Sequence, residues 1–409
     1  MAAEDRIVSG SLGIARSFPL PGARQGGARA DSWAGDRTAP RIGDKAGDGA
    51  GGAARFGAAQ AQGIPGRCRD PIMAPEAHRC CPMPLPPLAS PAIGVGTWAW
   101  GNQFLWGYQP GQDRALEACF RRAVALGLHF FDTADSYGTG RFNGRSEVLL
   151  GRFAAALPAE QRQMICVATK LAPFPWRLGR QGLEPALQAS RRRLQGKLDR
   201  VQLHWSTARY APWQEAPLLQ GLADGVGAGV VPQLGISNFG PEGLRRIHGL
   251  LAQRGVQLSS VQVQMSLLAP QAIGPGGLVA VARELGVEVI AYSPLALGLL
   301  TRPAGELPPL PSGPRGWLFR RLWPNLQPLL ARVEQIASGR GASMAAVALN
   351  WCRAHGAMPI PGLRSEQQAE AAAAAMTWNL EPAERLDLDR LALSQPAQAR
   401  MPANPFGSR

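Results

Sequence analysis

The sequence predicts an α/β protein: a (β/α)8 barrel, or TIM barrel, that follows a disordered N-terminal extension. From about residue 90, short apolar segments alternate with longer segments of helical periodicity. Eight such units fill roughly 280 residues, close to the size of this barrel with insertions. Polar residues stand at the ends of several expected strands, which is where this fold carries its functional groups.

Eight segments are expected to be strands because each is a short apolar run that precedes a turn or a helical segment. In chain order they are Ile93–Thr97, Leu128–Asp132, Ile165–Lys170, Arg200–His204, Val231–Ser237, Ser260–Val263, Val287–Tyr292 and Ala357–Ile360.

The segments between these strands are longer and carry apolar residues at helical spacing. The expected helices are Asp113–Leu126, Ser146–Ala156, Leu183–Leu194, Gln214–Ala228, Pro241–Gln253 and Gly276–Leu285. The last interval is longer and is expected to hold a loop at Thr301–Gly316, then helices at Leu326–Ala337 and Ser343–Ala354.

A doubly wound sheet is the alternative fold for an alternating pattern of this kind. It would need a glycine-rich phosphate turn that opens a helix directly after the first strand. Gly94-Val95-Gly96-Thr97 does not have that spacing. The barrel is therefore favoured.

Residues 1–85 form a Gly-, Ala- and Arg-rich extension, and residues 86–400 the expected barrel domain. Stretches such as Gly47–Ala54 cannot bury enough apolar surface to offset their ordering entropy, so the extension is expected to be disordered. Its acidic residues count against a transit peptide. A regulatory tail, or a true start at Met73 or Met83, remain alternatives.

Composition excludes several classes of protein. The formal net charge of +14 is spread along the chain, without an aromatic-interleaved basic patch, so no nucleic-acid partner is expected. No apolar run approaches the ~20 residues of a membrane span, and no secretory signal is present. None of the six cysteines forms a C-x-x-C pair. We expect a cytoplasmic protein without disulfides or a bound metal.

Four residues form a candidate catalytic set. Asp132, Lys170 and His204 end three successive strands, and Tyr137 lies in the loop after Asp132. Carbonyl reduction by hydride needs an acid for the developing oxyanion, and a tyrosine hydroxyl can serve. Lys170 is expected to lower the pKa of Tyr137, Asp132 to pair with Lys170, and His204 to orient the carbonyl oxygen.

Each of these residues also has an ordinary structural explanation. Asp132 can cap a turn, Tyr137 can pack in its loop, Lys170 can be a solvated strand end and His204 a buried, hydrogen-bonded side chain. The functional interpretation fails only if all four ordinary explanations are true at the same time. Their ordered placement on successive strand ends therefore favours catalysis.

From roughly Leu88 to Leu393 the chain resembles the aldo-keto reductase superfamily. The motifs that carry the resemblance are, in order, FDTADSYG, ATKL, LHW, GISNF, VQVQMSLL, AYSPLALGLL and IPGLRSEQQAE. The segments ATKLAPFPWRLGR, PSGPRG and ALNWC resemble more closely the chloroplast-type reductases of plants and their bacterial relatives. That group is related to pyridoxal reductases and potassium-channel beta subunits.

The resemblance implies an NADPH-dependent reductase of aldehydes and ketones, with the family's tyrosine at Tyr137, lysine at Lys170, aspartate at Asp132 and histidine at His204. It also implies contacts to NADPH. The expected cofactor residues are Ser237, Asn238 and Gln262 for the carboxamide, Tyr292 for the ring, Ser293 and Leu295 in the loop over the pyrophosphate, and Arg364 and Gln368 at the 2′-phosphate end.

One position departs from the family pattern. An asparagine that contacts the adenine usually stands about four residues after the glutamine, whereas this sequence has Ala372. We therefore expect a weaker contact with the adenine. Arg364 still favours NADPH over NADH, because a guanidinium matches phosphate geometry.

Aromatic residues near the strand ends suggest a flat apolar or aromatic carbonyl substrate. Packing at the barrel rim is an equal alternative. The expected substrate contacts are Trp98, Trp100, Trp176 and Trp205. Two other functions remain: an NADPH-binding regulatory subunit or sensor with little turnover, and a structural barrel that binds no cofactor.

Overall fold

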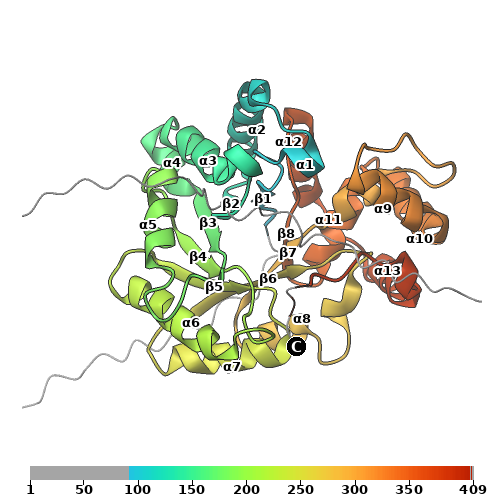
Figure 1. Ribbon diagram of the computed structural model, residues 1–409. Coiled ribbons are helices and arrows are strands. Elements are labelled where there is room, and N and C mark those ends of the chain that lie inside the picture. The colour runs from blue at the N-terminus through green and yellow to red at the C-terminus, as the bar shows by residue number, and fades with distance from the viewer. Residues whose placement is uncertain (1–91, 406, 408–409) are drawn as a thin grey trace, which may run out of the picture. The chain divides into compact units, whose positions relative to one another are not determined.

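The computed structural model describes residues 92–405 and 407, so the expected extension at 1–85 lies outside the described residues. Eight parallel strands form one sheet in the order β1 to β8, with helices arranged around it (Figure 1). This arrangement confirms the predicted barrel. The strands are β1 Val95–Gly96, β2 Phe130–Asp132, β3 Cys166–Leu171, β4 Arg200–Leu203, β5 Gln233–Ser237, β6 Leu258–Gln264, β7 Glu288–Tyr292 and β8 Ala357–Ile360.

Contacts between β1 and β8 close the barrel. The Gly94 and Gly96 amides donate to the carbonyls of Pro359 and Pro361, at 3.0 and 2.9 Å. A Cβ atom on Gly96 would lie 2.9 Å from the Ile360 carbonyl oxygen, closer than side chains normally approach. The closing seam therefore requires glycine at this position.

Helices cover the outside of the sheet. Those that follow the strands include α2 Asp113–Ala125, α3 Arg145–Ala155, α5 Glu184–Arg193, α6 Pro212–Gly227, α7 Pro241–Ala252, α8 Leu278–Glu284, α11 Met344–Ala354 and α12 Glu366–Ala374. The amphipathic pattern explains their placement. In α2, Leu116, Cys119, Phe120 and Ala123 are buried at a helical spacing, so one face of the helix packs on the barrel.

Several helices were not expected from the sequence. They are the short α1 Gln103–Trp106 and α4 Ala159–Met164, together with α9 Pro314–Leu322 and α13 Pro382–Ser394. The proline that begins α9 is suited to the first turn of a helix, where its missing N–H costs nothing. The expected helix Leu326–Ala337 is observed as α10 Gln327–Gly339.

Inside the barrel, an apolar layer supports the site residues. Phe130, Ala168, Ile290, Met358 and Ile360 form a cluster separate from the one between sheet and helices. We call these five residues the interior layer. Strand side chains alternate between faces, so a residue two positions further along a strand points to the same side.

Because of this alternation, a second layer of side chains, which are polar, lies inside the barrel above the interior layer. Asp132 stands two positions after Phe130, Lys170 two after Ala168, and Tyr292 two after Ile290. On β4, Arg200 contacts the Phe130 ring and pairs with Glu288 at 2.6 Å. Asp132, Lys170 and Tyr292 therefore lie towards the carboxyl ends of the strands, and the Arg200–Glu288 pair lies towards the amino ends.

In the described part of the chain, no helix is long and apolar enough to cross a bilayer. The same residues contain no group of three His, Cys, Asp or Glu side chains arranged to hold a metal ion. Cys119, Cys166 and Cys352 are free thiols. Burial raises the pKa of each of the three thiols, so each stays protonated at neutral pH.

Candidate active site

A buried ion pair forms the base of the site. The Lys170 ammonium donates to Asp132 Oδ2 at 2.5 Å and to the Thr133 carbonyl at 2.7 Å. The two charged side chains are 1% and 2% exposed. Charges this deeply buried are stable only when each is paired and hydrogen-bonded, and here each is.

Two glutamines complete the coordination of the aspartate. Gln262 and Gln202 donate to Asp132 Oδ1 at 2.7 and 3.2 Å. Gln262 was expected to contact a cofactor carboxamide, and its Nε2 is instead directed to Asp132. Gln202 was not expected, although it lies two residues before His204 and therefore on the same face of β4.

The loop after β2 brings Tyr137 over this pair. A Cβ atom on Gly138, whose φ is +116°, would lie 1.8 Å from the Phe142 carbonyl oxygen, so the chain can double back here only with glycine. The Tyr137 ring centroid lies 4.8 Å from Lys170 Nζ and 5.9 Å from the His204 ring centroid. All four predicted catalytic side chains therefore meet at one place.

The electrostatics of Tyr137 differ from the sequence-based expectation. Burial, and secondarily Asp132, raise the pKa of Tyr137 well above its usual value. The expectation of a lowered pKa was wrong, because burial of the ring and the Asp132 carboxylate together outweigh the attraction of the Lys170 ammonium. A tyrosine with a raised pKa keeps its proton at neutral pH. It can therefore act as a proton donor.

Burial also acts on the two basic groups. It lowers the pKa of Lys170, opposed by Asp132, and it lowers the pKa of His204 well below its usual value, assisted by the charge of Lys170. The His204 imidazole is therefore neutral at physiological pH. Its Nδ1 is buried and has no hydrogen-bond partner among the described residues. A neutral imidazole can donate one hydrogen bond to a carbonyl oxygen.

The predicted carboxamide and ring contacts lie beside this set. Asn238 follows β5 in a left-handed conformation with φ of +64°, and its Nδ2 donates to the His204 carbonyl at 3.0 Å and to Ser237 Oγ at 3.1 Å. The Tyr292 hydroxyl donates to Asn238 Oδ1 at 2.9 Å. Burial raises the pKa of Tyr292 to about 12.

The segment after β7 has an unusual backbone. Ser293, Ala296 and Leu297 all have positive φ angles near +50°, which non-glycine residues rarely adopt. Leu295 lies between them, half-buried. Arg315 of α9 donates to the Leu297 carbonyl at 3.0 Å and so holds this segment in place. Strained backbone of this kind persists where the surrounding structure supports it, often at ligand sites.

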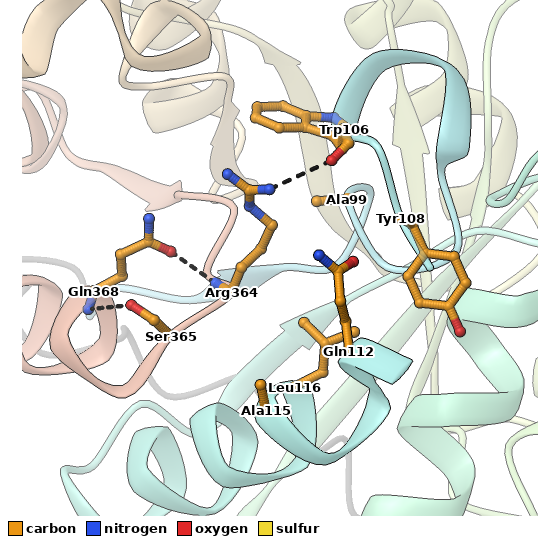
Figure 2. A pocket seen from close by; sticks show the side chains of 9 residues that line it. All are labelled: Ala99, Trp106, Tyr108, Gln112, Ala115, Leu116, Arg364, Ser365 and Gln368. Atoms are coloured by element: carbon orange, nitrogen blue, oxygen red, sulfur yellow. Dashed lines mark hydrogen bonds between the residues drawn. The ribbon is translucent and has the colours of Figure 1, made fainter. Parts of the chain in front are cut away.

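A cavity of about 260 Å³ is lined by Arg364 and Gln368, the residues predicted to bind the 2′-phosphate end of the cofactor. Figure 2 shows Arg364 between Trp106 and Gln368, with the Arg364 amide donating to Gln368 Oε1 at 2.7 Å. Two guanidinium groups lie over the Trp106 ring, with their central carbons 4.1 Å (Arg315) and 5.1 Å (Arg364) from its centroid. Among the described residues, both guanidiniums bond to backbone carbonyls, Arg315 to Leu297 and Arg364 to Trp106, and neither forms an ion pair. Arg364 lines the cavity, which therefore suits an anionic ligand.

The departure at Ala372 also has a structural setting. This alanine is 2% exposed on α12, the helix that packs against α2. It offers no polar group to an adenine.

Aromatic rings line one side of the opening. Phe174 stacks on Trp176 with centroids 4.7 Å apart, and Trp205 lies edge-on to Phe174 at 6.0 Å. Trp205 is also 4.9 Å from the His204 ring and donates to the Tyr210 hydroxyl at 2.9 Å. We call Phe174, Trp176, Trp205 and Tyr210 the aromatic wall. It leads from His204 to the surface, where Trp176 is 73% exposed.

The other two predicted tryptophans lie elsewhere. Trp98 is half-buried and packs edge-on against Trp106 at 6.2 Å. Trp100 is fully buried, contacts Phe153 and donates to the Leu363 carbonyl at 2.9 Å. It is a core residue of the β1–α3 region, and its predicted role as a substrate contact is not supported by this position.

Besides Gln202, Arg315 and Asn404 were not assigned from the sequence. Arg315 lies in the PSGPRG segment, but only the fold brings it onto Trp106. Asn404 lies beyond the expected end of the barrel and donates to Asn238 Oδ1 at 2.9 Å and to the Tyr292 hydroxyl at 2.8 Å. No periodicity or motif marks it.

Known proteins resemble this chain over the whole barrel. The model of the Aldo/keto reductase family matches residues 92–392. A chloroplastic pyridoxal reductase of Arabidopsis thaliana is 46% identical over 316 residues, which cover 76% of this chain and 85% of that protein. A 6-dehydroglucose reductase of Novosphingobium aromaticivorans is 30% identical over 314 residues, or 73% and 93% of the two chains.

A solved structure agrees with these relatives. An aldo-keto reductase from Klebsiella pneumoniae, in complex with NADPH, aligns with a TM-score of 0.57 at 26% identity. The alignment covers 77% of this chain and 94% of that one. Fold, site geometry and family match agree, and we conclude that this chain is an oxidoreductase that belongs to the aldo/keto reductase family.

Proposed function

We propose that this enzyme reduces aldehydes or ketones to alcohols with NADPH, and that Tyr137 donates the proton. The observation that carries the proposal is the meeting of Tyr137, His204 and the Lys170–Asp132 pair beside Asn238 and Tyr292. A carbonyl placed between the Tyr137 and His204 rings would face a protonated phenol and a neutral imidazole.

Each protein group then has a distinct task. Bound NADPH would supply the hydride to the carbonyl carbon. The carbonyl oxygen gains negative charge, and the Tyr137 hydroxyl gives its proton to that oxygen. An alkoxide is a much stronger base than a phenolate, so the raised pKa of Tyr137 does not prevent this transfer. His204 holds the oxygen by donating a hydrogen bond.

The Lys170–Asp132 pair serves the tyrosine after proton transfer. The phenolate of Tyr137 would lie close to the Lys170 ammonium, whose nitrogen is 4.8 Å from the ring centroid. Attraction at this distance stabilises the phenolate relative to its state without the lysine. Asp132 keeps the ammonium charged despite its burial, because it opposes the desolvation that lowers the pKa of Lys170.

The cofactor contacts follow from the same geometry. Asn238 and Ser237 would bind the carboxamide, and Tyr292 would stack on the nicotinamide ring. Ser293 and Leu295 would border the pyrophosphate, and Gln262 would act through Asp132. Arg364, Arg315 and Gln368 would bind the 2′-phosphate end, because two guanidiniums without carboxylate partners favour a phosphate. That end supports NADPH over NADH.

The proposed substrate is a small molecule with a flat aromatic ring that bears an aldehyde. The aromatic wall offers ring faces that run from His204 to the surface, and such faces favour planar substrates. The similarity to a protein named pyridoxal reductase points in the same direction. A cytoplasmic location remains a prediction.

The test is NADPH and NADH oxidation, followed at the reduced cofactor's absorbance, with a panel of aldehydes that includes pyridoxal and a nitrobenzaldehyde. We expect turnover with NADPH that Tyr137→Phe lowers at least a hundredfold, while NADPH binding is retained. Full turnover in Tyr137→Phe would remove the tyrosine from its role. NADPH binding without turnover on any aldehyde would instead support a regulatory subunit or sensor.

A further inference from the structure

The C-terminal segment 401–405 returns to the carboxyl ends of the strands. The Met401 amide donates to the Leu268 carbonyl at 2.9 Å, and the Pro405 carbonyl accepts from Arg209 at 3.2 Å. Met401 is buried, whereas Pro402, Ala403 and Pro405 are exposed. Between them, Asn404 reaches into the site and contacts Asn238 and Tyr292.

Asn404 fills the last hydrogen-bonding position of Asn238. A side-chain amide has two N–H donors and an oxygen with two lone pairs. The donors of Asn238 go to the His204 carbonyl and to Ser237 Oγ. Its oxygen accepts from the Tyr292 hydroxyl and from Asn404 Nδ2. A new ligand can therefore bond to Asn238 only by replacing one of these four partners.

Asn404 is the partner that is easiest to replace. The His204 carbonyl, Ser237 and Tyr292 belong to or directly follow strands of the barrel. Asn404 belongs to an irregular segment beyond the last helix, and such segments open at lower free-energy cost than core strands. Its side chain is also a primary carboxamide, the same chemical group that the nicotinamide ring carries.

We propose that residues 401–405 act as a carboxamide latch: Asn404 occupies the position on Asn238 that the cofactor carboxamide takes, and cofactor binding displaces it. This inference rests on the proposed function, since it assumes that Asn238 binds the carboxamide. Only molecules with an open latch can bind the carboxamide. The apparent affinity for the cofactor is therefore the intrinsic affinity multiplied by the fraction of molecules in which the latch is open. Removing the side chain should therefore strengthen binding.

The test compares wild type, Asn404→Ala and the control Ala403→Ser, which changes an exposed residue of the same segment. Titration should show that Asn404→Ala binds NADPH about three- to tenfold more tightly than wild type, the range expected when about one net hydrogen bond of competition is lost. Ala403→Ser should match wild type. Circular dichroism confirms that all three are folded.

A ligand without a carboxamide locates the effect. Adenosine 2′,5′-bisphosphate binds the phosphate end alone, so its affinity should be the same in wild type and Asn404→Ala. Tighter binding of both ligands to Asn404→Ala, or equal or weaker NADPH binding, would overturn the latch while the proposed function stands. If the wild type binds adenosine 2′,5′-bisphosphate but not NADPH, the latch is supported when Asn404→Ala restores NADPH binding and is overturned when it does not. Wild type that binds neither ligand overturns both proposals.

A second measurement follows the segment itself. Displacement of Asn404 should expose the bond after Arg400 to trypsin, because Met401 is held to Leu268 in the closed arrangement. We expect faster loss of residues 401–409, seen by mass spectrometry, when NADPH is saturating than with adenosine 2′,5′-bisphosphate. Protection by NADPH would contradict displacement.

Discussion

Lys170 and Asp132 lie 2.5 Å apart, nitrogen to oxygen, with both side chains almost completely withdrawn from solvent. Removing one member of such a pair leaves the other charge buried without its counter-ion. The pair therefore links the stability of the barrel to the chemistry of its site.

Asp132→Asn should lower the free energy of unfolding by about 3–5 kcal/mol and abolish most of the activity, because the Lys170 charge loses its partner. Urea denaturation measures the first effect. Asp224→Asn is the control, since Asp224 pairs with Arg180 and Arg254 at the exposed surface and should change stability by about 1 kcal/mol or less. Equal losses in the two variants would mean that burial of the pair has no energetic role.

The rate of reduction should be independent of pH through the neutral range. The pKa of Tyr137 is raised, so the protonated donor persists and is lost only as the pH rises through that elevated value. The pKa of His204 is lowered, so the imidazole stays neutral until the pH falls well below the usual pKa of a histidine. We expect kcat/KM for NADPH-dependent reduction to be flat between about pH 6.5 and 9. A decline that begins near pH 7 would contradict the raised pKa of Tyr137.

Arg364→Ala should weaken NADPH binding about ten- to a hundredfold, the loss expected for one charge-assisted hydrogen bond to a phosphate. The KM for NADH, which lacks the 2′-phosphate, should change by less than about threefold and serves as the internal control. Kinetics with both cofactors on one preparation provide the comparison. Parallel losses for the two cofactors would place Arg364 at a part of the ligand that they share.

Trp176→Ala and Phe174→Ala should raise the KM for aromatic aldehydes about two- to tenfold, which is the contribution expected from one aromatic contact. Propionaldehyde should be little affected because it has no ring to stack. Trp378→Ala is the matched control, since Trp378 packs against Arg340 near α13 and not at the wall. A similar increase for propionaldehyde would show that the wall shapes the opening without recognising rings.

The strand pattern allowed much of this site to be predicted. Short apolar runs with a polar residue at the end mark β2, β3 and β4, and alternation along each strand carries Asp132, Lys170 and His204 to one end of the barrel. Local sequence is sufficient to predict these three positions, because each residue lies at the end of the strand that positions it.

Other features depend on contacts between distant segments. Asn404 meets Asn238 across 166 residues of chain, and Arg315 of α9 lies over Trp106, which is far from it in the sequence. The direction of the Tyr137 pKa shift was also beyond the sequence. It depends on how far burial of the ring and the charge of Asp132 outweigh the charge of Lys170.

The interior layer and the Arg200–Glu288 pair beneath it have a consequence for the catalytic cycle. Packed side chains fill the barrel below the site, whereas the loops at the carboxyl ends of the strands lie at the surface. Once the tyrosine has given up its proton, a replacement must arrive from above, along the route by which aldehyde enters and alcohol leaves. Reprotonation of Tyr137 and exchange of product for substrate therefore use the same opening, at the carboxyl ends of the strands.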